Sequence, residues 1–89
     1  MSAWRLRLAA GAQRSLGGLP ERVAAAIVEF MLGPLVEEPR RVGKPLSREL
    51  AGYWAARRGP YRIVCRIDQE AGTVDVVRID HRSQLYRRR

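Results

Sequence analysis

The chain has 89 residues, a length that supports one small domain with a modest core, so we expect a single domain over residues 1–89. Its 17 basic and 9 acidic side chains give a net charge of +8, and a hydrophobic fraction of 46% argues against a disordered basic tail. One cysteine excludes an internal disulfide and no apolar run reaches transmembrane length, so we expect a cytoplasmic protein that does not enter a membrane.

The N-terminal part of the chain predicts one strand and two helices. Apolar residues alternate with arginines over 4–8, which is typical of a half-buried strand. Apolar residues then recur at spacings of three and four, and glycines interrupt this stripe, so we expect helices over 10–17 and 20–33. Pro20 suits the first turn of the second helix, and Gly33-Pro34 is expected to end it.

The C-terminal half predicts a three-stranded meander. Residues 39–52 are rich in glycine and proline and read as a connection, with one helical turn expected over 46–50. Strands are expected over 53–58, 61–68 and 73–80, separated by short turns. The order β-α-α-β-β-β predicts an α+β fold in which two N-terminal helices pack on a mainly antiparallel, four-stranded sheet.

The positive charge lies entirely in the second half of the chain. Residues 1–39 carry four arginines against four glutamates, whereas residues 40–89 carry thirteen basic against five acidic side chains, which is the whole +8. All but one of the basic residues are arginines. A guanidinium presents a planar fork of donors that matches phosphate oxygens, and it stacks on bases. This bias predicts a nucleic-acid partner for the second half.

Residue parity predicts which way the arginines of the middle strand point. The odd positions of this strand are apolar, whereas Arg62 and Arg66 share the other face. If Gly59-Pro60 is a two-residue loop, Arg57 lies directly opposite Arg62; a loop one residue different would put Arg58 there instead. Like charges in that position are destabilising, which favours an anion on this face. A solvated basic face without a ligand is the alternative.

Two motifs resemble the RelE family of bacterial toxins. One is the stretch 52–68 with its turn Gly59-Pro60-Tyr61-Arg62, and the other is the closing pattern His81-Arg82-x-x-x-Tyr86. The lead-in segments 43–46 and 49–52 also match, so the resemblance covers nearly the whole chain and agrees with the predicted order of elements. It implies the toxin of a toxin–antitoxin pair, an endoribonuclease that enters the ribosomal A site and cuts messenger RNA there.

The resemblance also implies roles for individual residues. Arg62 and Arg82 match the two arginines placed against the scissile phosphate, and Tyr86 matches the tyrosine that positions the reacting nucleotide. Arg57 matches the second of two basic residues on the preceding strand. The first of that pair falls on Ala55, where the chain departs from the family pattern, so the source of proton transfer is left open.

The residue inventory favours catalysis by positioning and charge stabilisation. Arginine hardly deprotonates at neutral pH, and the motifs hold no pair of carboxylates or histidines to act as acid and base. We therefore expect Tyr86 or His81 to assist proton transfer, although His81 also suits a strand end held by hydrogen bonds. No metal and no small-molecule cofactor is expected. Further RNA contacts are predicted for Lys44, Arg66, Arg87 and Arg88.

The resemblance implies three partners, namely messenger RNA, the ribosome and a RelB-like antitoxin that neutralises the toxin. The excess of positive charge also favours an acidic partner. Three other functions fit part of the pattern. One is a ParE-like toxin that acts on DNA gyrase, the second is a non-catalytic RNA-binding module, and the third is a toxin homologue that has lost activity.

Overall fold

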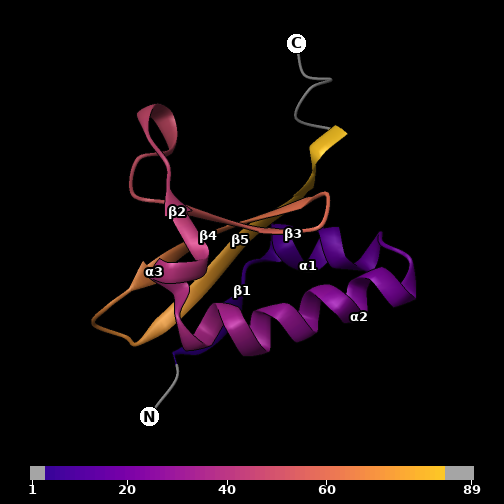
Figure 1. Cartoon of the computed structure of the whole chain (residues 1–89), viewed down its shortest axis with the longest axis horizontal. Helices are drawn as coiled ribbons and strands as arrows, with labels where there is room; N and C mark the ends of the chain where they lie inside the picture. Colours follow the sequence, from indigo (N-terminus) through magenta and orange to yellow (C-terminus); the bar gives the residue numbers. More distant parts are fainter. Residues whose placement is uncertain (1–3, 84–89) are drawn as a thin grey trace.

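The computed structural model describes residues 4–83 and is built around a five-stranded sheet (Figure 1). The spatial order is β1-β5-β4-β3-β2. β1 runs parallel to β5, and the other neighbours are antiparallel, so the α+β class is confirmed. The strands are β1 (Arg5–Leu8), β2 (Gly43–Pro45), β3 (Trp54–Arg58), β4 (Tyr61–Asp68) and β5 (Thr73–His81).

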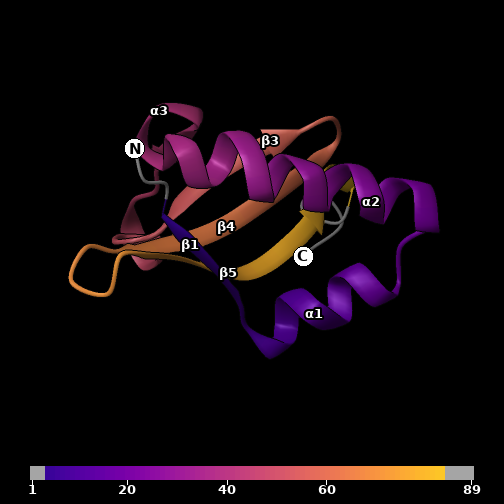
Figure 2. The ribbon, with the colours of Figure 1, turned by 90° about the horizontal axis from the view of Figure 1, so that it is seen from below.

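Two antiparallel helices cover one face of this sheet. α1 (Ala10–Gly17) and α2 (Glu21–Phe30) both lie below the sheet in Figure 1. In Figure 2, which is seen from below, α2 passes in front of the strands and α1 lies beside β5. Three short helical turns follow, namely η1 (Met31–Leu35), α3 (Pro39–Val42) and η2 (Arg48–Leu50). Within residues 4–83, no helix has both the length and the apolar character needed to span a bilayer.

The core lies between the helices and the covered face of the sheet. The odd positions of β4 point into it, as the residue parity predicted, and Ile63 and Cys65 are almost fully buried. α2 and η1 supply Ile27, Met31 and Leu35 from the other side. Burying a side chain of this size contributes about 1.5–3 kcal/mol, so this layer holds the helices to the sheet.

The second helix does not end at Gly33-Pro34, contrary to the sequence prediction. After Phe30 the helix widens into the π-helical turn η1, which contains Pro34, and it then continues through two further helical residues. A proline inside a helix costs about 3 kcal/mol because its ring clashes with the preceding turn, and a π-bulge relieves that clash. Met31 and Leu35 are both fully buried, and their combined burial outweighs this penalty.

The predicted four-stranded sheet is also wrong in its strand count, because β2 is a fifth strand. Gly43 and Lys44 pair with Ala56 and Ala55 of β3, and α3 occupies the start of the same predicted connection. A Cβ on Gly43 would lie 3.0 Å from the carbonyl oxygen of Pro39, so glycine allows this close approach. Three residues at a sheet edge show too little alternation to be recognised from sequence.

We predict that Ile27→Ala lowers the free energy of unfolding by about 2–5 kcal/mol, because it leaves a cavity between α2 and the sheet. Leu32→Ala, one turn further along, is the matched control, because Leu32 is 60% exposed and its truncation should change stability by less than about 0.5 kcal/mol. Urea unfolding followed by circular dichroism measures both. Equal losses in the two variants would contradict this view of the core.

Candidate functional site

The sheet face turned away from α1 and α2, which we call the open face, carries most of the charge of the sheet. The strand register identifies its members. All of its basic residues except Arg62 are exposed. The basic members are Arg5, Arg7, Lys44, Arg57, Arg62, Arg66 and Arg78, and the acidic ones are Asp68, Asp75 and Asp80.

The predicted pairing of two arginines is present on the open face. Arg57 of β3 lies directly opposite Arg62 of β4, and Ala55 lies opposite Val64. Gly59 has a φ of +60°, a left-handed conformation that the tight turn requires and that glycine adopts without strain. Arg58 therefore points to the covered side. The two-residue loop assumed from the sequence is confirmed.

An irregularity in β5 adds charged residues to the open face that the sequence reasoning did not identify. Val64 pairs with Arg78 and Cys65 pairs with Val76, so Val77 is an extra residue in β5. Such a β-bulge inverts the alternation beyond it. The spacing of the apolar core residues of β5 is a sign of this bulge, because they lie at 74, 76 and then 79 rather than at even positions throughout.

As a result Asp80 lies directly opposite Arg62, on the side away from Arg57. Its Oδ2 accepts a hydrogen bond from Nε of Arg78 at 2.9 Å and from Nη2 of Arg62 at 3.5 Å. Only 15% of the Asp80 side chain and 22% of the Arg62 side chain are exposed. Among the described residues, Nε of Arg62 is buried and has no hydrogen-bond partner. We call Arg57, Arg62, Asp80 and Arg78 the arginine row, in which Arg62 and Asp80 are semi-buried.

The other end of the open face holds a second ion pair. Nε and Nη2 of Arg7 donate to the two carboxylate oxygens of Asp75 at 2.9 and 3.0 Å. These hydrogen bonds hold the pKa of Asp75 below its usual value. Arg66 lies opposite Asp75 in the register, and Lys44 lies opposite Ala55. These two of the four predicted RNA contacts are therefore on the open face.

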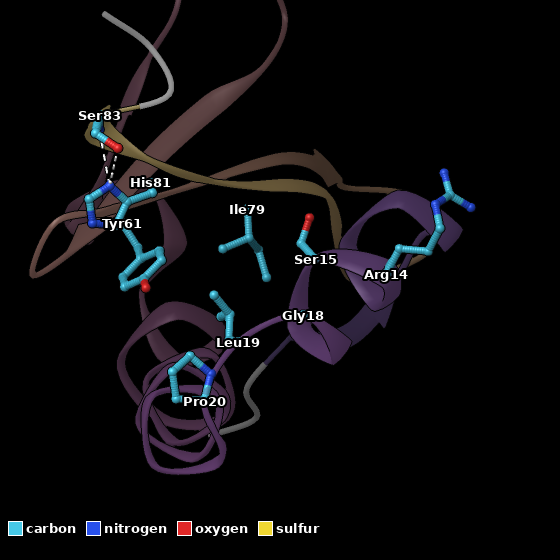
Figure 3. A pocket seen from close by; sticks show the side chains of 9 residues that line it. All are labelled: Arg14, Ser15, Gly18, Leu19, Pro20, Tyr61, Ile79, His81 and Ser83. Carbon is cyan, nitrogen blue, oxygen red and sulfur yellow. Dashed lines mark hydrogen bonds between the residues drawn. The ribbon is translucent and has the colours of Figure 1, made fainter. Parts of the chain in front are cut away.

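His81 lies on the covered side of the sheet, away from Arg62. Its ring packs edge-on against Tyr61 at a centroid distance of 5.0 Å, and Nδ1 accepts a hydrogen bond from the backbone N–H of Ser83 at 3.0 Å. These side chains line a hollow of about 510 Å³ near the α1–α2 connection. Figure 3 shows the lining residues, with Leu19 and Ile79 pointing toward each other across the hollow. The structure does not bring His81 together with the arginine row.

The remaining predicted site residues follow β5. The backbone N–H of Arg82 donates to the carbonyl oxygen of Pro60 at 2.7 Å, which places Arg82 at the same end of the sheet as Arg57 and Arg62. Three predicted residues lie outside the described part of the chain, namely Tyr86, Arg87 and Arg88.

Cys65 is unsuited to nucleophilic chemistry. The thiol is buried in the core, and this burial raises its pKa to about 11, so it stays protonated at neutral pH. Among residues 4–83, no group of three or more histidine, cysteine or acidic side chains is arranged to hold a metal ion.

Comparisons with known proteins identify close relatives. The profile of the family described as the ParE toxin of type II toxin–antitoxin systems matches residues 6–86. Toxin RelG of Mycobacterium tuberculosis is 54% identical over 85 residues, which covers 96% of this chain and 98% of the relative. Toxin RelE of the same organism is 46% identical over 84 residues, which covers 94% of this chain and 87% of that toxin.

Solved structures agree with this result. A chain of the toxin–antitoxin complex RelBE2 from Mycobacterium tuberculosis superposes with a TM-score of 0.87 at 53% identity, covering 91% of this chain and all of the other. The isolated RelE toxin of E. coli has a TM-score of 0.74 at 20% identity, with 94% and 92% of the two chains covered. The second likeness shows a shared fold alone.

We predict that Asp75 makes stability depend on pH at the acidic end. Its folded pKa lies below the unfolded value because Arg7 donates to the carboxylate. The stabilisation is therefore complete above the unfolded pKa, at about pH 4, and is lost as the pH falls through the folded pKa. Urea unfolding between pH 3 and pH 7 should show Asp75→Asn less stable than the original chain at pH 7, with the two converging in acid. Parallel curves would contradict this.

Proposed function

The chain belongs to the ParE toxin family of type II toxin–antitoxin systems, and from this premise and the geometry of the open face we propose that it is a ribosome-dependent endoribonuclease. It is the toxin of a RelBE-type system, as its relatives and their structures indicate. The activity we propose is cleavage of messenger RNA in the ribosomal A site, which stops translation. This is the activity implied by the resemblance of its motifs to the RelE family.

One observation carries the proposal, namely the pair of arginines directly opposite each other on the open face. Two like charges in adjacent strands repel each other by up to about 1 kcal/mol, and both arginines lie on the face turned away from α1 and α2. An RNA phosphate relieves this repulsion and receives two forks of donors. Arg62, which is semi-buried, is held more rigidly than the exposed Arg57 and is the better candidate for the scissile phosphate.

The chemistry that arginines supply is stabilisation of charge. The 2′-hydroxyl loses its proton as it attacks the neighbouring phosphorus, and the bond to the 5′-oxygen breaks as that oxygen takes up a proton. Negative charge builds on the equatorial oxygens in between, and guanidinium groups already aimed there stabilise it without reorganising. Removing one such donor typically slows an enzyme about 10²–10³-fold. We assign this role to Arg62 and Arg82, with Arg57 as the neighbouring cation, and we propose that no metal takes part.

Proton transfer is assigned to Tyr86 rather than to His81. The imidazole lies on the covered side of the sheet, where Nδ1 already accepts the hydrogen bond of Ser83. Reaching the open face would require the end of β5 to turn over. The resemblance puts Tyr86 against the reacting nucleotide, and a phenol hydroxyl both donates and accepts a hydrogen bond, so it can hand a proton on. A weak acid–base system also explains why such a toxin would need the ribosome to hold its substrate in line.

The proposed partners follow from the relatives and from charge. Crystal structures of RelE toxins with RelB antitoxins support a RelB-like antitoxin as the neutralising partner of this chain. A net charge of +8 favours an acidic partner as well as ribosomal RNA, and Lys44, Arg66, Arg87 and Arg88 are the proposed contacts with RNA. Because its proposed substrate is messenger RNA on the translating ribosome, the proposed location is the cytoplasm.

A gyrase inhibitor is the second candidate, because the matching profile is named for ParE toxins. The named relatives favour RNA cleavage, since both curated toxins carry Rel names at 54% and 46% identity. Inhibition of gyrase would not require a semi-buried Arg62 directly opposite Arg57. The two functions differ in the process that stops first after expression, translation or DNA supercoiling.

We predict that brief expression of the chain produces cuts inside the codons of translated messages, and that Arg62→Ala slows this cleavage about 10²–10³-fold because one donor to the phosphorane is lost. Arg62→Lys keeps the charge but loses the fork of donors, so its cleavage rate should fall between those of the original chain and Arg62→Ala. Primer extension maps the 5′ ends, and blocking translation serves as the control, because cuts that depend on the ribosome then disappear.

Uncut messages together with relaxed DNA would overturn the proposal in favour of gyrase. Uncut messages together with tight binding to ribosomes would instead indicate a non-catalytic RNA-binding module. Cleavage by Arg62→Ala at the original rate would leave the activity intact but refute the assignment of the site.

Neighbouring arginines of β3 offer a matched pair of variants. Arg57→Ala removes a cation from the open face, whereas Arg58→Ala removes one from the covered side, one residue away on the same strand. Both lower the net charge by one. We predict that ribosome-programmed cleavage falls at least about tenfold more for Arg57→Ala than for Arg58→Ala, because direct contact with phosphate matters more than net charge. Equal losses would indicate long-range attraction only.

A further inference from the structure

A carboxylate in the middle of the arginine row is the feature that the proposed reaction does not use. Asp80 lies on the open face, directly opposite Arg62, and Arg57 lies opposite Arg62 on the other side. An acidic side chain repels RNA, so its presence in a face that binds phosphate requires an explanation. Asp75 is a second acidic residue on the same face.

Asp80 joins two arginines through a single oxygen. Its Oδ2 accepts from Nε of Arg78 at 2.9 Å and from Nη2 of Arg62 at 3.5 Å. Arg78 is 48% exposed in its side chain, whereas Arg62 is 22% exposed and Asp80 is 15% exposed. The carboxylate therefore lies lower in the face than the Arg78 guanidinium that it binds. In this semi-buried position the charges are screened less than at the surface.

The position of Asp80 determines where the Arg62 fork points. Without it, Arg62 would be flanked by the cations of Arg57 and Arg78 and would swing away from both. With it, one terminal nitrogen of Arg62 is drawn toward β5, and donors of the same guanidinium are left for an anion above the face. Asp75 makes a similar ion pair with the exposed Arg7, far from this row, so it provides a comparison without the positioning effect.

We propose that Asp80 is a positioning residue, which holds Arg62 and Arg78 side by side as a preformed pair of donors for the scissile phosphate. The effect of this positioning on cleavage rests on the proposed function, whereas the alignment of the two arginines does not. It explains why the face tolerates an acid, because the loss in attraction for RNA is offset by the alignment of two forks. It also adds Arg78 to the residues that contact the phosphate.

Neutralising Asp80 distinguishes positioning from simple repulsion of RNA, because the two explanations predict opposite changes in the cleavage rate. Asp80→Asn raises the net charge by one and keeps a hydrogen-bond acceptor of the same shape. If Asp80 only repels RNA, the variant should bind ribosomes more tightly and cut at least as fast. If Asp80 aligns Arg62, the variant should bind as tightly or more tightly and cut more slowly.

The experiment is single-turnover cleavage on ribosomes programmed with a defined message, with toxin concentration varied to separate the maximal rate from the half-saturating concentration. For Asp80→Asn we expect a maximal rate at least about tenfold lower, since a misplaced group commonly costs one to two orders of magnitude in rate, and a half-saturating concentration that is unchanged or lower. Asp75→Asn, the charge-matched control, should lower the half-saturating concentration alone. Asp80→Glu should restore part of the rate. An unchanged maximal rate in Asp80→Asn overturns the proposal.

A second measurement does not depend on cleavage. Proton–nitrogen NMR of the free protein reports whether the guanidinium of Arg62 is held still, through resolved signals and slow rotation of its terminal nitrogens. These should be present in the original chain and in Asp75→Asn and be lost in Asp80→Asn. If the original chain fails to cut messages, the proposed function fails, while this measurement still decides the positioning role. Signals of Arg62 that are unchanged in Asp80→Asn refute it.

Discussion

The sheet buries only one of its faces against α1 and α2, and this one-sided burial constrains the other features of the molecule. Successive side chains of a strand point to opposite faces, so every apolar residue committed to the core places a neighbour on the open side. In β4 the core takes Ile63 and Cys65, and the open side receives Arg62 and Arg66. The core and the charged face are thus two results of the same alternation.

The bulge at Val77 reconciles two demands on β5 that a regular strand would not meet together. Val74 and Val76 lie in the core before the bulge, and Ile79 lies in the core after it. Without the extra residue, the alternation that buries the valines would send Ile79 to the open side and Asp80 into the apolar layer. The bulge lets all three apolar residues stay buried, and it brings a carboxylate beside Arg62.

Two arginines directly opposite each other are compatible with a stable fold, because burial of the core contributes far more free energy than their repulsion costs. Each large apolar side chain in the core contributes about 1.5–3 kcal/mol, whereas a repelling cross-strand pair at the surface costs about 0.2–1 kcal/mol. Several buried residues therefore outweigh the repulsion between Arg57 and Arg62. An anion that binds between these two arginines relieves their repulsion and is bound more tightly for it. A small domain can thereby keep two arginines directly opposite each other without losing its structure.

Local patterns in the sequence determined the two N-terminal helices, the meander and the pairing of Arg57 with Arg62, because periodicity and a two-residue turn are properties of neighbouring residues. They did not determine where the second helix ends or that 43–45 pairs as a strand, since burial of Met31 and Leu35 overrides Pro34 and a sheet edge supplies the partner for β2.

The same division holds for the site. Most of the residues proposed to bind phosphate could be named from their types and spacing. The side of the sheet on which His81 lies and the contact of Asp80 with Arg62, however, depend on one inserted residue in β5. An insertion of this kind is decided by which side chains the core accepts, and that competition exists only once the strands and helices have packed together.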